Sequence, residues 1–177
     1  MSAAMPMTER ILGIDPGSRV TGFGIIDVCQ TSTHYVASGA VQCADGSLPE
    51  RLQLIYRSIS EIVAEYKPHT VAIESVFMHR NAGSALKLGQ ARAAAMCATF
   101  SANATVHEYA PREIKLALVG SGAATKEQVQ HMVTSLLELD GTPSSDAADA
   151  LATAICHAQH RRMKLRLAGM VAIAGDR

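Results

Sequence analysis

The sequence predicts a single α/β domain in which a mixed sheet of five strands carries helices on both faces. Short apolar runs rich in Val and Ile, bounded by Gly, Pro or an acidic residue, indicate strands. Longer stretches in which apolar residues recur every three or four positions indicate amphipathic helices. The elements follow as three strands, a helix, a strand, a helix, a strand and further helices, an order typical of a layered α/β fold.

The length and composition suit one compact domain. The chain has 177 residues, of which 48% are apolar and 18% charged, a balance that excludes intrinsic disorder. No apolar stretch approaches the roughly 18 residues of a membrane-spanning helix, and the first residues carry no secretory signal, so we expect a cytoplasmic protein without a membrane partner. The four cysteines form no CxxC pair and are expected to stay reduced.

Three strands open the chain and are expected to form an antiparallel meander. The first, Arg10–Asp15, is a short apolar run that ends in an acid, and the Pro-Gly-Ser turn at residues 16–18 follows it. The next two, Val20–Val28 and His34–Cys43, are rich in Val, Ile, Phe and Tyr and are interrupted by glycines.

A long helix and a buried strand come next. Ser47 and Glu50 form a capping-box pattern with proline in the first turn, and apolar residues recur behind them until Pro68. Thr70–Glu74 is a second apolar run that ends in an acid, which predicts another buried strand.

The second half of the chain adds a strand and four helices. The first helix, Ala82–Ala102, is dominated by small residues, which favours close packing either inside the domain or against a second copy of the chain. The other elements are predicted over Thr105–Tyr109, Pro111–Gly120, Ala124–Leu137 and from Ser144 or Ser145 into Arg161–Arg166.

Four acidic residues are expected to converge. Asp15 and Glu74 each end a buried strand, and the carboxyl ends of strands are where α/β folds hold their sites. Asp146 and Asp149 are three residues apart at the start of a helix, so they project from one face. Clustered carboxylates repel one another, and Mg²⁺ is a usual compensating ion. Taken singly, each acid also fits a turn, a strand end or a helix first turn.

Basic residues are concentrated in the middle of the chain, although the net charge is zero. Acids beside a basic segment suit an enzyme that holds cations at one point and a polyanion around it; a solvated surface is the alternative. Between residues 79 and 126 the bases are Arg80, Lys87, Arg92, Arg112, Lys115 and Lys126.

Four motifs stand in order along the chain: IDPGSRVTGFG (14–24), AIESVFM (72–78), NAGSALKLGQAR (81–92) and SDAADALA (145–152). In sequence and spacing they resemble the RuvC family of bacterial Holliday junction resolvases over about residues 10–160. The resemblance implies a ribonuclease H-like fold, a homodimer, Mg²⁺-dependent nicking of four-way DNA junctions, and the branch-migration proteins RuvA and RuvB as partners. Only the ends depart from it, so we expect a flexible N-terminal extension over 1–9, one nuclease domain over 10–166 and a C-terminal tail over 167–177.

The resemblance also implies a role for each acid and for several other residues. The catalytic and metal-binding positions of the family fall on Asp15, Glu74, Asp146 and Asp149. Such a site would hold two Mg²⁺ ions, with Mn²⁺ as an alternative, and would leave 5′-phosphate and 3′-hydroxyl ends. Two lysines needed for activity fall on Lys115 and Lys126. Phe77 matches a phenylalanine that packs against DNA at the crossover, with a core or dimer-interface role as the alternative. Further candidate DNA contacts are Arg80, Lys87 and Arg112.

Three other functions remain open from the sequence. The GIDPGS segment at residues 13–18, with the glycine-rich hairpin behind it, also resembles the first phosphate loop of actin- and Hsp70-type ATPases. Those enzymes clamp nucleotide between two lobes, for which 177 residues are too few. A catalytically silent junction-binding protein is the second alternative, and the presence of all four acids argues against it. A related nuclease that acts on RNA is the third.

Overall fold

The computed structural model describes residues 8–29, 32–75 and 81–175 of the chain. The expected N-terminal extension falls almost entirely outside these residues, and its last residue, Glu9, already belongs to the first strand. Phe77 and Arg80 also lie outside the described residues.

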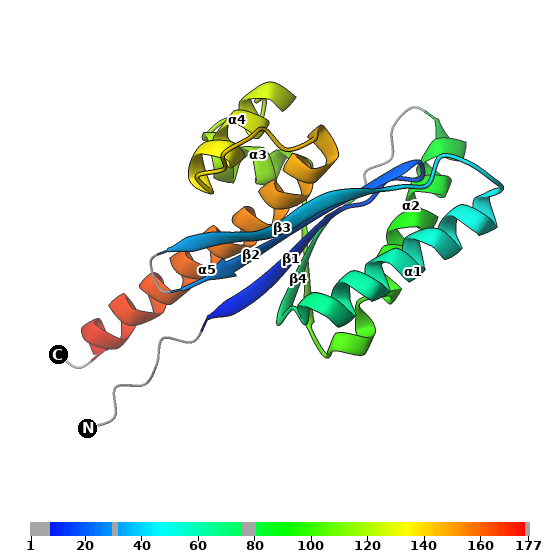
Figure 1. The fold of residues 1–177 in the computed structure, drawn as a ribbon. Helices are drawn as coiled ribbons and strands as arrows, with labels where there is room; N and C mark the ends of the chain where they lie inside the picture. Colours follow the sequence, from blue (N-terminus) through cyan, green and yellow to red (C-terminus); the bar gives the residue numbers. More distant parts are fainter. Residues whose placement is uncertain (1–7, 30–31, 76–80, 176–177) are drawn as a thin grey trace.

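The sheet has five strands in the order β3-β2-β1-β4-β5 (Figure 1). The antiparallel meander expected from the sequence is present as β1 (Glu9–Asp15), β2 (Val20–Val28) and β3 (Thr33–Gln42). The other two strands, β4 (Thr70–Glu74) and β5 (Thr105–Tyr109), run parallel to β1. The sheet is therefore mixed, and β1 lies at its centre with a parallel neighbour on one side only.

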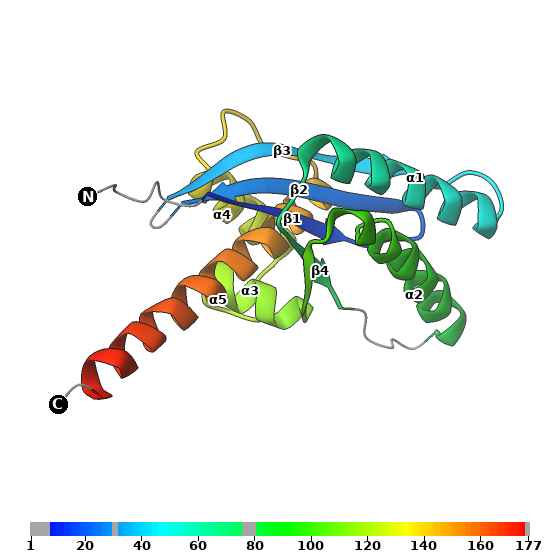
Figure 2. The same ribbon diagram turned by 90° about the horizontal axis from the view of Figure 1, so that it is seen from below.

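Two helices cover one face of the sheet (Figure 2). In α1 (Leu48–Tyr66) the buried residues are one turn apart, and they pack on the side chains of β1, β2 and β4 that face this layer. The second helix, α2 (Ala82–Cys97), is shorter than the predicted Ala82–Ala102. Both the amide and the hydroxyl of Thr99 bond to the carbonyl of Met96, which tightens the chain into a 3₁₀ turn over Phe100–Ala102.

Three helices cover the opposite face: α3 (Pro111–Val119), α4 (Lys126–Leu136) and α5 (Ser145–Gly175). Ser144 precedes α5 and caps it, because its hydroxyl accepts a hydrogen bond from the amide of Ala147 at 3.4 Å. The helix does not stop near Arg166 but continues to Gly175, so most of the expected tail prolongs α5 past the sheet (Figure 1). None of the described helices is long and apolar enough to cross a membrane.

Glycines allow α5 to lie directly on β1 and β2. A Cβ atom on Gly13 would come within 2.0 Å of the carbonyl oxygen of Ala150, and one on Gly22 within 2.0 Å of that of Asp146. Side chains at these positions would lift the helix off the sheet. The glycines therefore fix how closely the acidic first turn of α5 approaches the end of β1.

Replacing Gly22 with alanine is expected to displace the first turn of α5. The methyl group would collide with the main chain of Asp146, and overpacking of this kind costs about 1–3 kcal/mol. We expect a lower midpoint of thermal unfolding and slower cleavage of the DNA junctions that the family resemblance implies as the substrate. Gly141→Ala is the matched control, because a Cβ there meets no atom within 4 Å. Equal midpoints and cleavage rates in both variants would show that the close approach at Gly22 is unimportant.

Candidate active site

Asp15 and Glu74 lie on the same face of the sheet, at the carboxyl ends of adjacent parallel strands. The register pairs Ile14 of β1 with Ile73 of β4, so the two acids, one residue further along, end their strands side by side. Side chains alternate between faces along a strand, and Ile14 and Ile73 belong to the core cluster beneath α1 and α2. Asp15 and Glu74 therefore face the layer that contains α5.

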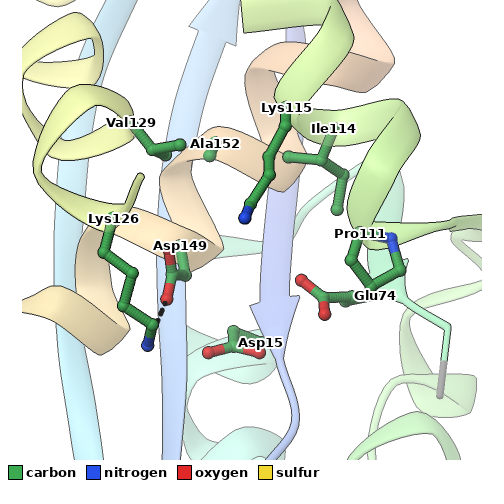
Figure 3. A pocket seen from close by; sticks show the side chains of 9 residues that line it. All are labelled: Asp15, Glu74, Pro111, Ile114, Lys115, Lys126, Val129, Asp149 and Ala152. Carbon is green, nitrogen blue, oxygen red and sulfur yellow. Dashed lines mark hydrogen bonds and ion pairs between the residues drawn. The ribbon is translucent and has the colours of Figure 1, made fainter. Parts of the chain in front are cut away.

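The first two turns of α5 bring the remaining two acids to this edge of the sheet. Asp149 lines the same cavity as Asp15 and Glu74, and the carbonyl of Asp146 lies against Gly22. The cavity has a volume of about 240 Å³. Its lining residues, all shown in Figure 3, are Asp15, Glu74, Pro111, Ile114, Lys115, Lys126, Val129, Asp149 and Ala152.

Two lysines reach the cavity from the neighbouring helices. Lys126 is the first residue of α4, which begins there because Thr125 and Gln128 form a capping box. Its Nζ lies 3.4 Å from Oδ2 of Asp149, as the dashed line in Figure 3 marks. Lys115 extends from α3 between Asp149 and Glu74 in the same view. The cavity thus combines carboxylates with two cations from different helices.

The electrostatics of the cavity oppose ionisation of its carboxylates. Burial, together with the smaller effects of the charges on Glu74, Asp149 and Asp146, raises the pKa of Asp15 to about 8, although Lys126 opposes the rise. Burial and the charge of Asp149 raise the pKa of Glu74 to about 7. The pKa of Asp149 is also raised, mainly by burial, although Lys126 opposes the rise. A cation placed in the cavity would relieve this cost, because it would favour the ionised forms.

The donor set fits a hard divalent cation. The cavity offers carboxylate oxygens and no thiol or imidazole among its lining residues, which is the ligand chemistry that Mg²⁺ and Mn²⁺ prefer. Within the described ranges, no three His, Cys, Asp or Glu side chains surround a single point closely enough to hold one ion. Asp15, Glu74 and Asp149 border a cavity, and a cation held there would need further oxygen ligands from water or substrate.

Of the other cations predicted to bind DNA, the two that the structure describes, Lys87 and Arg112, do not line the cavity. Lys87 is exposed on α2, on the opposite face of the sheet. Arg112 is exposed on α3, and its side chain lies against Gly122 in the loop before α4.

Sequence reasoning attached no individual role to Arg92, yet its Nε donates a hydrogen bond to the main-chain carbonyl of Glu74 at 3.2 Å. No local sequence pattern predicts this contact, because the two residues are 18 positions apart in the sequence.

The strand order, the helices on both faces and the acids at the ends of β1 and β4 define an α/β fold of the ribonuclease H-like class. The family model "Crossover junction endodeoxyribonuclease RuvC" matches residues 11–157. The chain belongs to the RuvC family.

Relatives and solved structures agree with this membership. The RuvC of Aeromonas salmonicida is 54% identical over 159 residues, which cover 90% of this chain and 92% of the relative. That of Methylococcus capsulatus is 54% identical over 162 residues, with 92% and 98% covered. Thermus thermophilus RuvC in complex with a Holliday junction substrate superposes with a TM-score of 0.82 at 34% identity, covering 88% of this chain and 96% of that one. The yeast mitochondrial resolvase Ydc2, at 11% identity and a TM-score of 0.63, shares the fold.

Proposed function

We propose that this protein is a structure-selective endonuclease that resolves four-way DNA junctions by paired, symmetric nicks during recombination and repair. The observation that carries the proposal is the single cavity in which Asp15, Glu74 and Asp149 meet two lysines at the carboxyl ends of β1 and β4. Membership of the RuvC family and the likeness to a RuvC bound to a Holliday junction support the choice of substrate.

The four acids would hold two Mg²⁺ ions, with Mn²⁺ as the alternative. Asp15 would serve both ions, with Glu74 on one side and the Asp146/Asp149 pair on the other, and the influence of all three neighbouring acids on Asp15 supports this role. Ions held by these residues would supply an activated water and would stabilise the leaving 3′-oxygen, so that the products would carry 5′-phosphate and 3′-hydroxyl ends. The chain's own part would be to hold these carboxylates buried and oriented toward the scissile phosphate, while the bound cations would favour their ionised forms.

Lys115 and Lys126 would bind phosphates beside the scissile bond. Their ammonium groups enter the cavity from α3 and α4, and the ion pair with Asp149 holds Lys126 at its rim. Because they lie next to the acids, they would also reduce the repulsion between the carboxylates and an incoming phosphodiester. Phe77, Arg80, Lys87 and Arg112 remain proposed DNA contacts.

Removing Lys115 or Lys126 is expected to change the salt dependence of junction binding. Each lysine that neutralises one phosphate contributes roughly one to the slope of log K against log salt, so Lys115→Ala or Lys126→Ala should reduce the slope by about one. Binding titrations at several salt concentrations, without divalent ions, measure this. Arg57→Ala removes an exposed cation from α1 on the other face and serves as the control. An unchanged slope would remove the lysine concerned from the binding surface.

A homodimer is proposed through the outer face of α2. The small residues of this helix divide between two sides, and Ala91 and Ala95, with Ala98 at the C-cap, pack inward against the core. The outer side borders a hollow of about 420 Å³ lined by Ala82, Ala85, Leu86, Gly89, Arg92, Ser75 and Glu108. Leu86 is 70% exposed there, and a two-fold contact would cover it in both copies. Two active sites would then supply the paired cuts, and sedimentation equilibrium measures the mass directly.

One cleavage assay separates the proposed function from its alternatives. The protein is incubated with a mobile four-way junction, a matched linear duplex and an RNA–DNA hybrid, each with Mg²⁺ and with chelator. We expect paired nicks in the junction only, and only with Mg²⁺. Cleavage confined to the hybrid would indicate an RNA-directed nuclease, and binding without cleavage would indicate a silent junction-binding protein. The proposed partnership with RuvA and RuvB is tested by adding both to the junction reaction.

A further inference from the structure

Arg92 connects α2 to the strand ends that carry the active site. Its Nε donates to the main-chain oxygen of Glu74 at 3.2 Å, and its Nη2 lies 2.6 Å from Oε2 of Glu108 on β5. The Nη2–Glu108 contact is an ion pair whose N–H is not aligned as a hydrogen bond. The Arg92 side chain is only 19% exposed, so its guanidinium is largely withdrawn from solvent. A charge in this position requires partners, and the carbonyl of Glu74 is one of them.

The main chain at Glu74 is held from a second direction as well. Glu74 is the last residue of β4, and it stands opposite Tyr109 in the register with β5. The next residue, Ser75, donates from its amide to the carbonyl of Tyr109 at 2.8 Å and from its hydroxyl to the same oxygen at 3.1 Å. The peptide group that joins Glu74 to Ser75 is therefore fixed through its oxygen by Arg92 and through its N–H by β5.

We propose that Arg92 is a positioning residue for Glu74, an inference that rests on the proposed function. Fixing this peptide group sets the direction in which the Glu74 side chain leaves the strand, and that side chain lines the cavity with Asp15. Without the hydrogen bond from Arg92 to the Glu74 carbonyl, which we call the clamp, the carboxylate of Glu74 would be free to move. Small displacements of a group at an active site slow the chemical step. Arginine suits the position because its planar fork reaches two partners at once, whereas a lysine ammonium is a single point.

The test compares three variants of the full-length protein. Arg92→Met removes the clamp, Arg92→Lys keeps the charge, and Glu108→Gln removes the ion pair while leaving the bond to Glu74. Each is measured for the single-turnover cleavage rate at saturating junction, the Kd for the junction, the affinity for Mn²⁺ without DNA, and the midpoint of unfolding in chelator. Arg57→Met, on the exposed surface of α1, is the control for the loss of one cation.

For Arg92→Met we expect the cleavage rate to fall about 10- to 100-fold and the affinity for Mn²⁺ to fall several-fold, with the junction Kd changed less than about twofold. Arg92→Lys should recover part of the loss, and Glu108→Gln should lose about twofold or less. The inference is overturned if Arg92→Met cleaves and binds Mn²⁺ like the wild type. It is also overturned if Glu108→Gln loses as much rate as Arg92→Met, because the ion pair alone would then account for the effect. A Glu74→Gln variant that still cleaves would overturn the proposed function instead.

Discussion

Asp15→Asn is expected to abolish junction cleavage, with a rate at least about 1,000-fold below that of the wild type. Asp15 lies at the centre of the acidic group, where the charges of Glu74, Asp146 and Asp149 all act on it. An amide in its place keeps the shape but removes the negative charge that would hold the ions. Single-turnover cleavage of a labelled four-way junction in Mg²⁺ measures the loss.

Binding and folding should survive the same substitution. The lysines at the cavity are unaltered, and one buried negative charge is gone, so the junction Kd measured in Ca²⁺ or without metal should be similar to that of the wild type or tighter. Asp140→Asn, at an exposed loop position outside the cavity, is the matched control and should cleave normally. Substantial cleavage by Asp15→Asn would show that Asp15 is not at the centre of the chemistry.

The metal-free protein is expected to become more stable as the pH falls from about 8 to 6.5. The pKa values of Asp15 (about 8) and Glu74 (about 7) are above their ordinary values, so the folded state binds more protons than the unfolded state in this range. The free energy of unfolding therefore decreases as the pH rises through these values. For Asp15 alone the change is about 1–2 kcal/mol, or about 4 °C in the midpoint of unfolding.

The chosen range separates this effect from the titration of a buried histidine. The pKa of His157 is lowered to about 4 by burial and by His107, so the stability it contributes is lost only as the pH falls below about 6.5. Thermal unfolding in chelator at pH 8.5, 7.5 and 6.5 measures the trend, and Asp15→Asn should flatten it. Saturating Mg²⁺ should also flatten it, because a bound cation keeps the carboxylates ionised. A midpoint independent of pH in chelator would contradict the raised pKa values.

Local patterns were sufficient for most of the fold. The meander, the long helix after Ser47 and the strand ending at Glu74 were predicted within a residue or two, because strand alternation, capping and breakers act over short distances. The ends of α2 and α5 were not. The 3₁₀ turn after α2 depends on the bonds that the amide and the hydroxyl of Thr99 make to the Met96 carbonyl. The helix α5 continues to Gly175 because no helix-ending residue stands at Arg166.

Local sequence patterns were enough to place Asp15 and Glu74 at the ends of buried strands and to place Asp146 and Asp149 at the start of α5. How these four acids meet depends on contacts that form when the layers pack. The parallel pairing of β1 with β4, the bare glycine surface beneath α5 and the reach of Arg92 to the Glu74 carbonyl are contacts between distant parts of the chain. The same holds for the raised pKa of Asp15, because burial and the neighbouring charges exist only once the layers have packed.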